Sequence, residues 1–321
     1  MPEIDESATC GQALCQILTR LLDELTLNEA GVRAAADMGS LHNYRVAIRR
    51  ARVVVRLFGE IMPAHSADYF SAELRWLGQL TSPLRDADTQ LAALAGYNKW
   101  LPEELSSSLE RFHSHLQQVH ISERGKIMTA LAGKRYELFM AYWRAFVANG
   151  PAGWNNRAWT IYAGVAGREI WRQYRRMVRR GRDIGAGAPA GTLHELRKDG
   201  KKLRYLIEFF DMAAHGGEAE KLLKQLRRLQ DVLGAHQDYE VHADTILKFC
   251  EQLALDESAS YKDFLALGVL TGRLNGLQAA ARDNFSARFK KFSSKRSKRD
   301  FRILCNIAEN EKPDQTPVSV F

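Results

Sequence analysis

The sequence has few of the features that mark disulfide frameworks, metal sites or membrane spans. Its 321 residues include only 4 cysteines, at positions 10, 15, 250 and 305. They lack C-x-x-C spacing and are expected to be reduced thiols rather than zinc ligands or a disulfide frame. No stretch approaches the roughly 18 apolar residues of a membrane-spanning helix. The acidic start, MPEIDES, lacks the basic region of a secretory signal, so we expect a cytoplasmic protein.

Proline and strand-like alternation are also scarce. The chain has 8 prolines, and two of them, Pro313 and Pro317, lie near the end. Between breaks, apolar residues recur at the three- and four-residue spacing of helices. The clearest breaks are residues 148–153 (ANGPAG) and 181–191 (GRDIGAGAPAG). The sequence therefore predicts an all-α fold, and the polar residues 306–321 are predicted to be a disordered tail.

The chain contains an internal repeat with an offset of 152 residues. The segment Leu41–Arg45 aligns with Leu193–Arg197, and without a gap Asp86 then falls on Asp238. This register predicts a duplication of about four helices per half, consistent with two four-helix bundles. The expected halves are residues 8–150 and 151–305.

Each copy of the repeat carries a cationic helix face. At 100° per residue, the cations of the first copy fall within one arc of about 80°, and the opposite side of the helix is apolar. The fifteen residues 42–56 contain no acid. Solvated helices usually intersperse acids, because like charges four residues apart repel. The first arc consists of His42, Arg45, Arg49, Arg52 and Arg56, and the second of His194, Arg197, Lys201 and Arg204, widened by Lys198 and Lys202.

Further cations make the second half the more basic one, so it is expected to bind an anion more tightly. A third arc contains Arg168, Arg172, Arg175, Arg179 and Arg182. At the equivalent positions of the first half, only Arg20 is basic. Lys221, Lys224, Arg227 and Arg228 add to this charge.

The net charge of +8 and the pI of about 9.3 fit a polyanionic partner, and the residue types favour phosphate. Arginine contacts phosphate oxygens through a planar fork, and lysine acts as a mobile point charge. His42 and His194 are expected to add positive charge beside a phosphate polymer, because its field raises the pKa of histidine.

The two basic segments resemble the signatures of the CHAD family, the conserved-histidine α-helical domains. Residues 41–52 read LHNYRVAIRRAR, and residues 194–205 read HELRKDGKKLRY. Residues 84–88 (LRDAD) and 229–238 (LQDVLGAHQD) resemble two further family segments. The resemblance spans roughly residues 12–305.

This resemblance implies two four-helix bundles related by a pseudo-two-fold axis, with the basic helices facing a central pore or groove. It also implies binding of inorganic polyphosphate, which phosphate or sulfate ions would mimic, and association with polyphosphate granules. The implied lining is the first arc on one side and, on the other, His194, Arg197, Lys198, Lys201 and Arg204. Arg20, Arg172, Arg175 and Arg179 are implied to flank it. Two positions depart from the pattern: Gly200 interrupts the second helix, and Glu208 replaces the basic Arg56.

Catalysis, a cofactor, a metal and a membrane partner are not expected. The sequence has no P-loop or nucleophile–base motif, and no triphosphate-processing segment of the kind often fused to CHAD domains. Asp86 and Asp238 are expected to orient arginines, with cation binding as the alternative. His113, His115 and His120 have a loosely metal-like spacing, but an exposed helix face is favoured.

Two alternative functions stay open. One is nucleic-acid binding, which the lysines and arginines of residues 290–299 also suit, although the first arc has no aromatic residue for base stacking. The other is an enzyme that acts on polyphosphate, for which Asp86, Asp88 and Asp238 are the candidate Mg²⁺ ligands.

Overall fold

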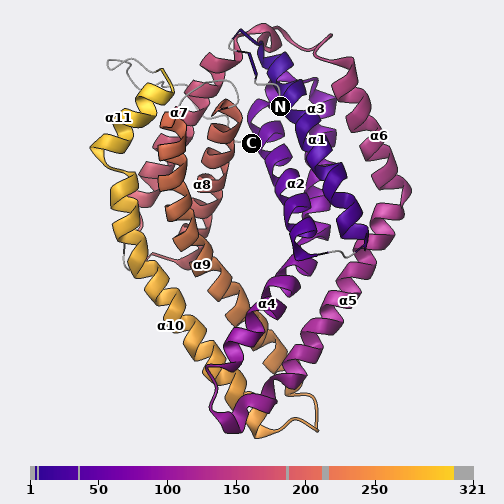
Figure 1. Cartoon of the computed structure of the whole chain (residues 1–321), viewed down its shortest axis with the longest axis vertical. Coiled ribbons are helices and arrows are strands. Elements are labelled where there is room, and N and C mark those ends of the chain that lie inside the picture. The colour runs from indigo at the N-terminus through magenta and orange to yellow at the C-terminus, as the bar shows by residue number, and fades with distance from the viewer. Residues whose placement is uncertain (1–3, 6, 35–36, 186–187, 212–216, 307–321) are drawn as a thin grey trace. The chain divides into compact units, whose positions relative to one another are not determined.

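The structure is a computed structural model that describes residues 4–5, 7–34, 37–185, 188–211 and 217–306 (Figure 1). These residues form helices joined by short connections, and the all-α prediction is confirmed. The predicted tail lies outside the described residues from position 307 onward. The helices are α1 (Cys10–Ala34), α2 (Met38–Phe58), η1 (Gly59–Ile61), α3 (Ala64–Leu80), α4 (Ser82–Asn98), η2 (Glu103–Leu109), α5 (Glu110–Ala132), α6 (Lys134–Asn149), η3 (Asn156–Trp159), α7 (Tyr162–Arg182), α8 (Ala190–Asp211), α9 (Gly217–Leu253), α10 (Tyr261–Phe292) and α11 (Lys295–Leu304).

The helix bounds keep the 152-residue offset of the sequence repeat. Helix α2 begins at Met38 and α8 begins at Ala190, which is 38 + 152. Helix α1 begins at Cys10 and α7 at Tyr162, again 152 residues later. The first two helices of each half therefore start at equivalent positions.

Each half contains four helical stretches, some of which are interrupted. In the first half, α3 and α4 are separated only by Thr81, and α5 and α6 only by Gly133. Pro83 lies in the first turn of α4 and cannot donate a backbone hydrogen bond, so it ends the preceding helix. The equivalent residue of α9 is Ala235, and α9 continues without a break.

The described residues form two compact units. Unit 1 draws on Met1–Ala8, Ile161–Leu233 and Asn284–Phe321, and unit 2 on Thr9–Thr160 and Gly234–Asp283. Residues 234–283 belong to the second half in sequence but to unit 2 in space. The reason is an apolar core in which Ile246 and Phe249 of α9 and Leu270 and Leu274 of α10 pack with α4, η2 and α5.

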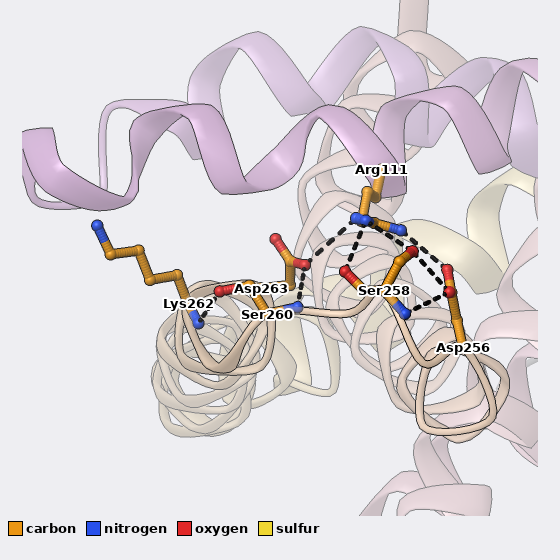
Figure 2. A network of polar contacts seen from close by, with 6 residues as sticks. All are labelled: Arg111, Asp256, Ser258, Ser260, Lys262 and Asp263. Carbon is orange, nitrogen blue, oxygen red and sulfur yellow. Dashed lines mark hydrogen bonds and ion pairs between the residues drawn. The ribbon is translucent and has the colours of Figure 1, made fainter.

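Arg111 fastens the loop between α9 and α10 to helix α5 within unit 2, as Figure 2 shows. Its Nη1 lies 2.8 Å from Asp256 Oδ2, and its Nη2 donates to the carbonyl oxygen of Ser258 at 2.8 Å. Its Nε lies 3.4 Å from Asp263 Oδ2, which also accepts from Ser260 N at 2.9 Å at the start of α10. These contacts hold the loop against the end of the apolar core.

In unit 1, aromatic side chains fasten the end of α10 and all of α11 to α7. The rings of Tyr174 and Phe301 stack with centroids 4.0 Å apart, and Phe292 contacts Tyr174 edge-on at 5.5 Å. Gly181 is required by this packing, because a Cβ there would lie 2.2 Å from the ring of Phe289. This attachment fixes which face of α11 points outward.

A pair of packing positions exchanges its large and small residues between the two copies. In unit 2, Ile48 of α2 faces Gly78 of α3, where a Cβ would lie 3.9 Å from Ile48 Cγ2. The equivalent positions in unit 1 are Gly200 and Gln230, and a Cβ on Gly200 would lie 3.4 Å from Gln230 Nε2. Gly200 therefore permits a close approach of α8 to α9 and to Met177 of α7.

Among the described residues, no helix combines the length and the low charge needed to cross a membrane.

The exchange of Ile48 and Gly78 in unit 2 for Gly200 and Gln230 in unit 1 predicts that substitutions at positions 200 and 230 have coupled effects on stability. Gly200→Ile should lower the free energy of unfolding by about 1–3 kcal/mol, because the added side chain overfills the contact. Adding Gln230→Ala should recover part of that loss, because unit 2 accommodates isoleucine opposite a small residue. Urea unfolding of the full chain, followed by circular dichroism, measures both effects; strictly additive losses would contradict the predicted contact.

Candidate anion-binding surfaces

Helix α2 separates an apolar face from a cationic face as predicted. Asp37 begins the helix by accepting a hydrogen bond from Ser40 N at 2.7 Å. His42, Arg52 and Arg56 are exposed, and Arg45 and Arg49 are half-buried. The buried face, which packs against α1 and α3, consists of Leu41, Tyr44, Ala47, Ile48, Ala51, Val54, Val55 and Phe58.

Arg45 is held at the break between α3 and α4. Its Nη1 donates to the carbonyl oxygen of Gly78 at 3.2 Å and to Thr81 Oγ1 at 2.8 Å, and its Nη2 donates to Ser82 Oγ at 3.0 Å. Burial and the nearby charge of Arg49 lower the pKa of Arg45 to about 10, so its guanidinium remains charged at neutral pH. Arg45 therefore presents a fixed positive charge.

Two arginines outside the predicted set lie beside this face, and one of them, Arg75, extends it. Burial, followed by the charges of Arg75 on α3 and Arg56, lowers the pKa of Arg52. Arg85 on α4 lies close enough to Arg45 to lower the pKa of that residue as well. The 152-residue offset aligns Arg75 with Arg227, and this alignment is the signal in the sequence that identifies Arg75.

Four of the arginines on this face form no ion pair with a carboxylate among the described residues. Within the described part of the chain, no ion pair joins Arg49, Arg52, Arg56 or Arg75 to an acid, and the buried Nε of Arg49 has no hydrogen-bond partner. Like charges held close together without acids attract a mobile anion. We call Arg45, Arg49, Arg52, Arg56 and Arg75 the α2 arginine face.

Asp86 and Asp238, the repeated acids, lie at the Arg45 end of this face. Desolvation raises the pKa of Asp86, the charge of Arg45 lowers it, and that of Asp238 raises it again. The two acids thus influence each other and Arg45 within unit 2. Their carboxylates reduce the positive potential at this end, so the other end of the face is the stronger anion attractor.

Arg20 lies on α1, where it forms an ion pair with Glu24 at 3.1 Å. Glu24 also pairs with Arg50 of α2 at 3.3 Å. The charge of Arg20 is therefore partly neutralised by a contact that joins α1 to α2.

The equivalent contact in unit 1 is built differently. Position 24 corresponds to Arg176 and position 50 to Lys202, which are both cations. Asp199, which occupies the position of Ala47, is 1% exposed and lies 3.6 Å from each of them. Arg180 contacts Asp199 more closely still. A buried carboxylate with three cations satisfies the requirement that interior charges be paired.

The cationic face of α8 is more neutralised than that of α2. Lys198 forms an ion pair with Glu195, and Arg204 lies 3.5 Å from Glu208, the acid that replaces Arg56. His194, Arg197 and Lys201 are half-buried on the same helix. These ion pairs leave α8 with less uncompensated positive charge than the number of its basic residues indicates.

The remaining predicted residues lie on outer faces of unit 1. Arg172, Arg175 and Arg179 are exposed on α7, and Arg172 pairs with Glu169 at 2.5 Å. Lys224 is exposed on α9, and Arg227 pairs with Glu220 at 3.2 Å. It is Arg176 and Arg180, not these residues, that contact α8. The ion pairs therefore argue against tighter binding by the second half, which was expected from its charge count.

Two of the three histidines of α5 have separate contacts. His120 Nε2 lies 3.1 Å from the buried Asp88, and the ring of His115 packs on Phe249 at 4.7 Å. Among the residues that the structure describes, no cluster of histidine, cysteine and acidic side chains has the arrangement of a metal site.

Comparisons with known proteins agree with this architecture. The family model described as CHAD domain matches residues 16–247. Among solved structures, the chain is similar to the CHAD domain from the plant Ricinus communis, with a TM-score of 0.75 and 23% identity over 89% of this chain and 93% of that chain. PptA from Streptomyces chartreusis is also similar, with a TM-score of 0.67 and 15% identity over 88% of this chain and 100% of that chain.

No curated protein matches the sequence significantly. The family match covers well over half of the chain, and its two basic segments lie on equivalent helices. The chain therefore belongs to the CHAD domain family.

Proposed function

We propose that this protein binds inorganic polyphosphate without turning it over. The observation that carries the proposal is the α2 arginine face, whose Arg49, Arg52, Arg56 and Arg75 have no ion pair to an acid within the described residues. A row of guanidinium groups on successive helix turns suits a linear ligand with a phosphate at every step. Membership of the CHAD family adds support.

The half-buried position of Arg45 and Arg49 supports binding by preorganisation. Arg45 is held by three hydrogen bonds, so it loses little side-chain freedom when an anion binds. Its surroundings also exclude part of the water that would otherwise screen a phosphate charge.

The chemistry of this face favours polyphosphate over nucleic acid. Proteins that bind single strands place aromatic side chains beside the cations for base stacking. The cationic arc of α2 contains histidine and arginine only, and the aromatic residues of α2, Tyr44 and Phe58, are buried on the opposite side. The face can thus contact phosphates but offers bases no platform.

The α8 face serves in this proposal as a second, weaker surface, because Lys198 and Arg204 are already paired with acids. In the cell, such binding would place the protein on polyphosphate granules in the cytoplasm.

Neutralising the α2 arginine face should weaken binding. The variant Arg49→Gln/Arg52→Gln/Arg56→Gln should lower affinity for polyphosphate at least about tenfold and make the log–log salt slope shallower by about 2, because three phosphate contacts are lost. Isothermal titration at several salt concentrations measures both. The matched control Lys99→Gln/Arg144→Gln/Lys262→Gln removes three exposed charges elsewhere in unit 2 and should change neither by much.

An equal loss in the control would show that the α2 face has no special role. A cooperative thermal transition near that of the parent chain should accompany the triple variant, since Arg52 and Arg56 are exposed. Unfolding would show instead that these arginines are structural.

A competition experiment tests whether the protein prefers polyphosphate to RNA. Polyphosphate should displace labelled RNA of matched charge from the protein, and RNA should displace polyphosphate poorly, because the α2 face lacks stacking aromatics. Fluorescence anisotropy measures both directions. RNA binding as tight as polyphosphate binding would contradict the proposal.

The non-catalytic assignment predicts no turnover. Incubation with long-chain polyphosphate and Mg²⁺ should release no orthophosphate and leave the chain-length distribution unchanged on a gel. Phosphate release that disappears in Asp86→Asn/Asp238→Asn would identify an enzyme that uses these acids to hold the metal.

A further inference from the structure

Much of the net charge of the protein lies in one short segment. Residues 288–302 contain eight cations and one acid, Asp300, a net charge of +7, whereas the whole chain carries +8. This segment forms the end of α10 and helix α11 in unit 1. Neither cationic arc of the repeat includes it.

Helix α11 points this charge outward. Its Phe301 and Ser297 are buried, with Phe301 stacked on Tyr174 at 4.0 Å, and the helix begins where Ser294 Oγ accepts from Ser297 N at 3.2 Å. Lys295, Arg296, Lys298 and Arg299 are all exposed. Like charges three and four residues apart destabilise a helix by a few tenths of a kcal/mol per pair, and a ten-residue helix is marginal on its own. The packing against α7 thus maintains a charge pattern that α11 itself disfavours.

The exposed arginines of α7 continue this surface. Helix α11 contacts α7 through Tyr174 and Trp171, with Arg302 lying over the Trp171 ring at 5.6 Å, and α8 contacts α7 through Arg176 and Arg180. At 100° per residue these two contact sides of α7 are separated by one solvent-facing arc. Between positions 168 and 182, the five residues on that arc are exposed arginines: Arg168, Arg172, Arg175, Arg179 and Arg182.

We propose that the outward faces of α7 and α11 form one cationic surface that binds the continuation of a long polyphosphate chain. The inference rests on the proposed function, and it assigns chain-length selectivity to this surface. A polymer long enough to engage it together with the cationic face of α8, which lies in the same unit, gains affinity through effective concentration, whereas a short chain does not. The first half has no such surface, because Asp23 and Leu27 stand where α7 has Arg175 and Arg179.

The structure favours a soluble phosphate polymer over a membrane or single-stranded nucleic acid. The apolar side of α11 is occupied by Tyr174, so the helix cannot insert that side into a lipid interface. Phe289, Phe292 and Phe301 are buried, which leaves α11 and the end of α10 without an exposed aromatic residue for stacking. On α11 itself the exposed side carries four cations beside one large apolar residue, Ile303, and Trp171 of α7 is half-buried beneath Arg302.

The test compares polyphosphate chains of about 10 and about 100 phosphates. In Lys295→Gln/Arg296→Gln/Lys298→Gln/Arg299→Gln, affinity for the long chain should fall roughly tenfold, with a salt slope shallower by about 3, while affinity for the short chain stays within about twofold. The control Lys99→Gln/Arg144→Gln/Lys262→Gln/Arg273→Gln removes the same charge from exposed positions of unit 2 and should retain the long-chain preference.

Equal long-chain affinity in the variant and its control would overturn the inference. So would a selective loss of RNA or anionic-vesicle binding, measured in parallel, with long-chain polyphosphate binding intact. Failure of the proposed function is seen separately, as short-chain binding that survives Arg49→Gln/Arg52→Gln/Arg56→Gln. Circular dichroism verifies that each variant is folded.

Discussion

The cost of withdrawing an unpaired arginine from water shapes helix α2 and its surroundings. A buried ion without a partner costs several kcal/mol, so the half-buried guanidinium of Arg45 requires hydrogen-bond acceptors. The break between α3 and α4 provides them as the carbonyl of Gly78 and the hydroxyls of Thr81 and Ser82. Pro83, which has no backbone N–H to donate, causes that break. One proline thereby determines where the charge of Arg45 on the α2 arginine face is held.

The same constraint explains how the two copies diverged. Where the first copy pairs Glu24 with Arg50, the second has Arg176 and Lys202, a combination that would repel. The buried Asp199 lies between them and contacts Arg180 as well. The second copy therefore uses several of its extra cations to hold α7 to α8. A surplus of basic residues in a sequence is thus a poor measure of the charge available to a ligand.

Three helices of this CHAD domain have one side that attaches them to their neighbours and another side that carries exposed cations. Helices α2 and α7 bury one apolar or ion-paired side and leave arginines on the other, and α11 does the same through Phe301. Since the buried sides are fixed by packing, the direction in which each exposed side faces is fixed too, and Arg45 is held in addition by its hydrogen bonds. Preorganised charge of this kind lowers the conformational cost of binding a flexible polymer.

Local pattern was sufficient for much of the fold and for part of the candidate site. The helical period gave the all-α class and the apolar side of α2, and the 152-residue register gave helices that begin at equivalent residues. It also aligned Arg75 with Arg227, although Arg75 had not been included in the predicted face. These features depend on neighbours within a few residues or on repetition, which a sequence displays directly.

Tertiary structure alone decided which charges are paired between helices. Arg172, Lys198 and Arg204 pair with Glu169, Glu195 and Glu208, which lie three or four residues away on the same helix, so the sequence displays these pairs. By contrast, Asp199 looks like an isolated acid in a basic segment until α7 is packed against α8. Periodicity gives the direction in which a side chain points, but the electrostatic energy of a charge depends on which groups other helices bring within a few ångströms.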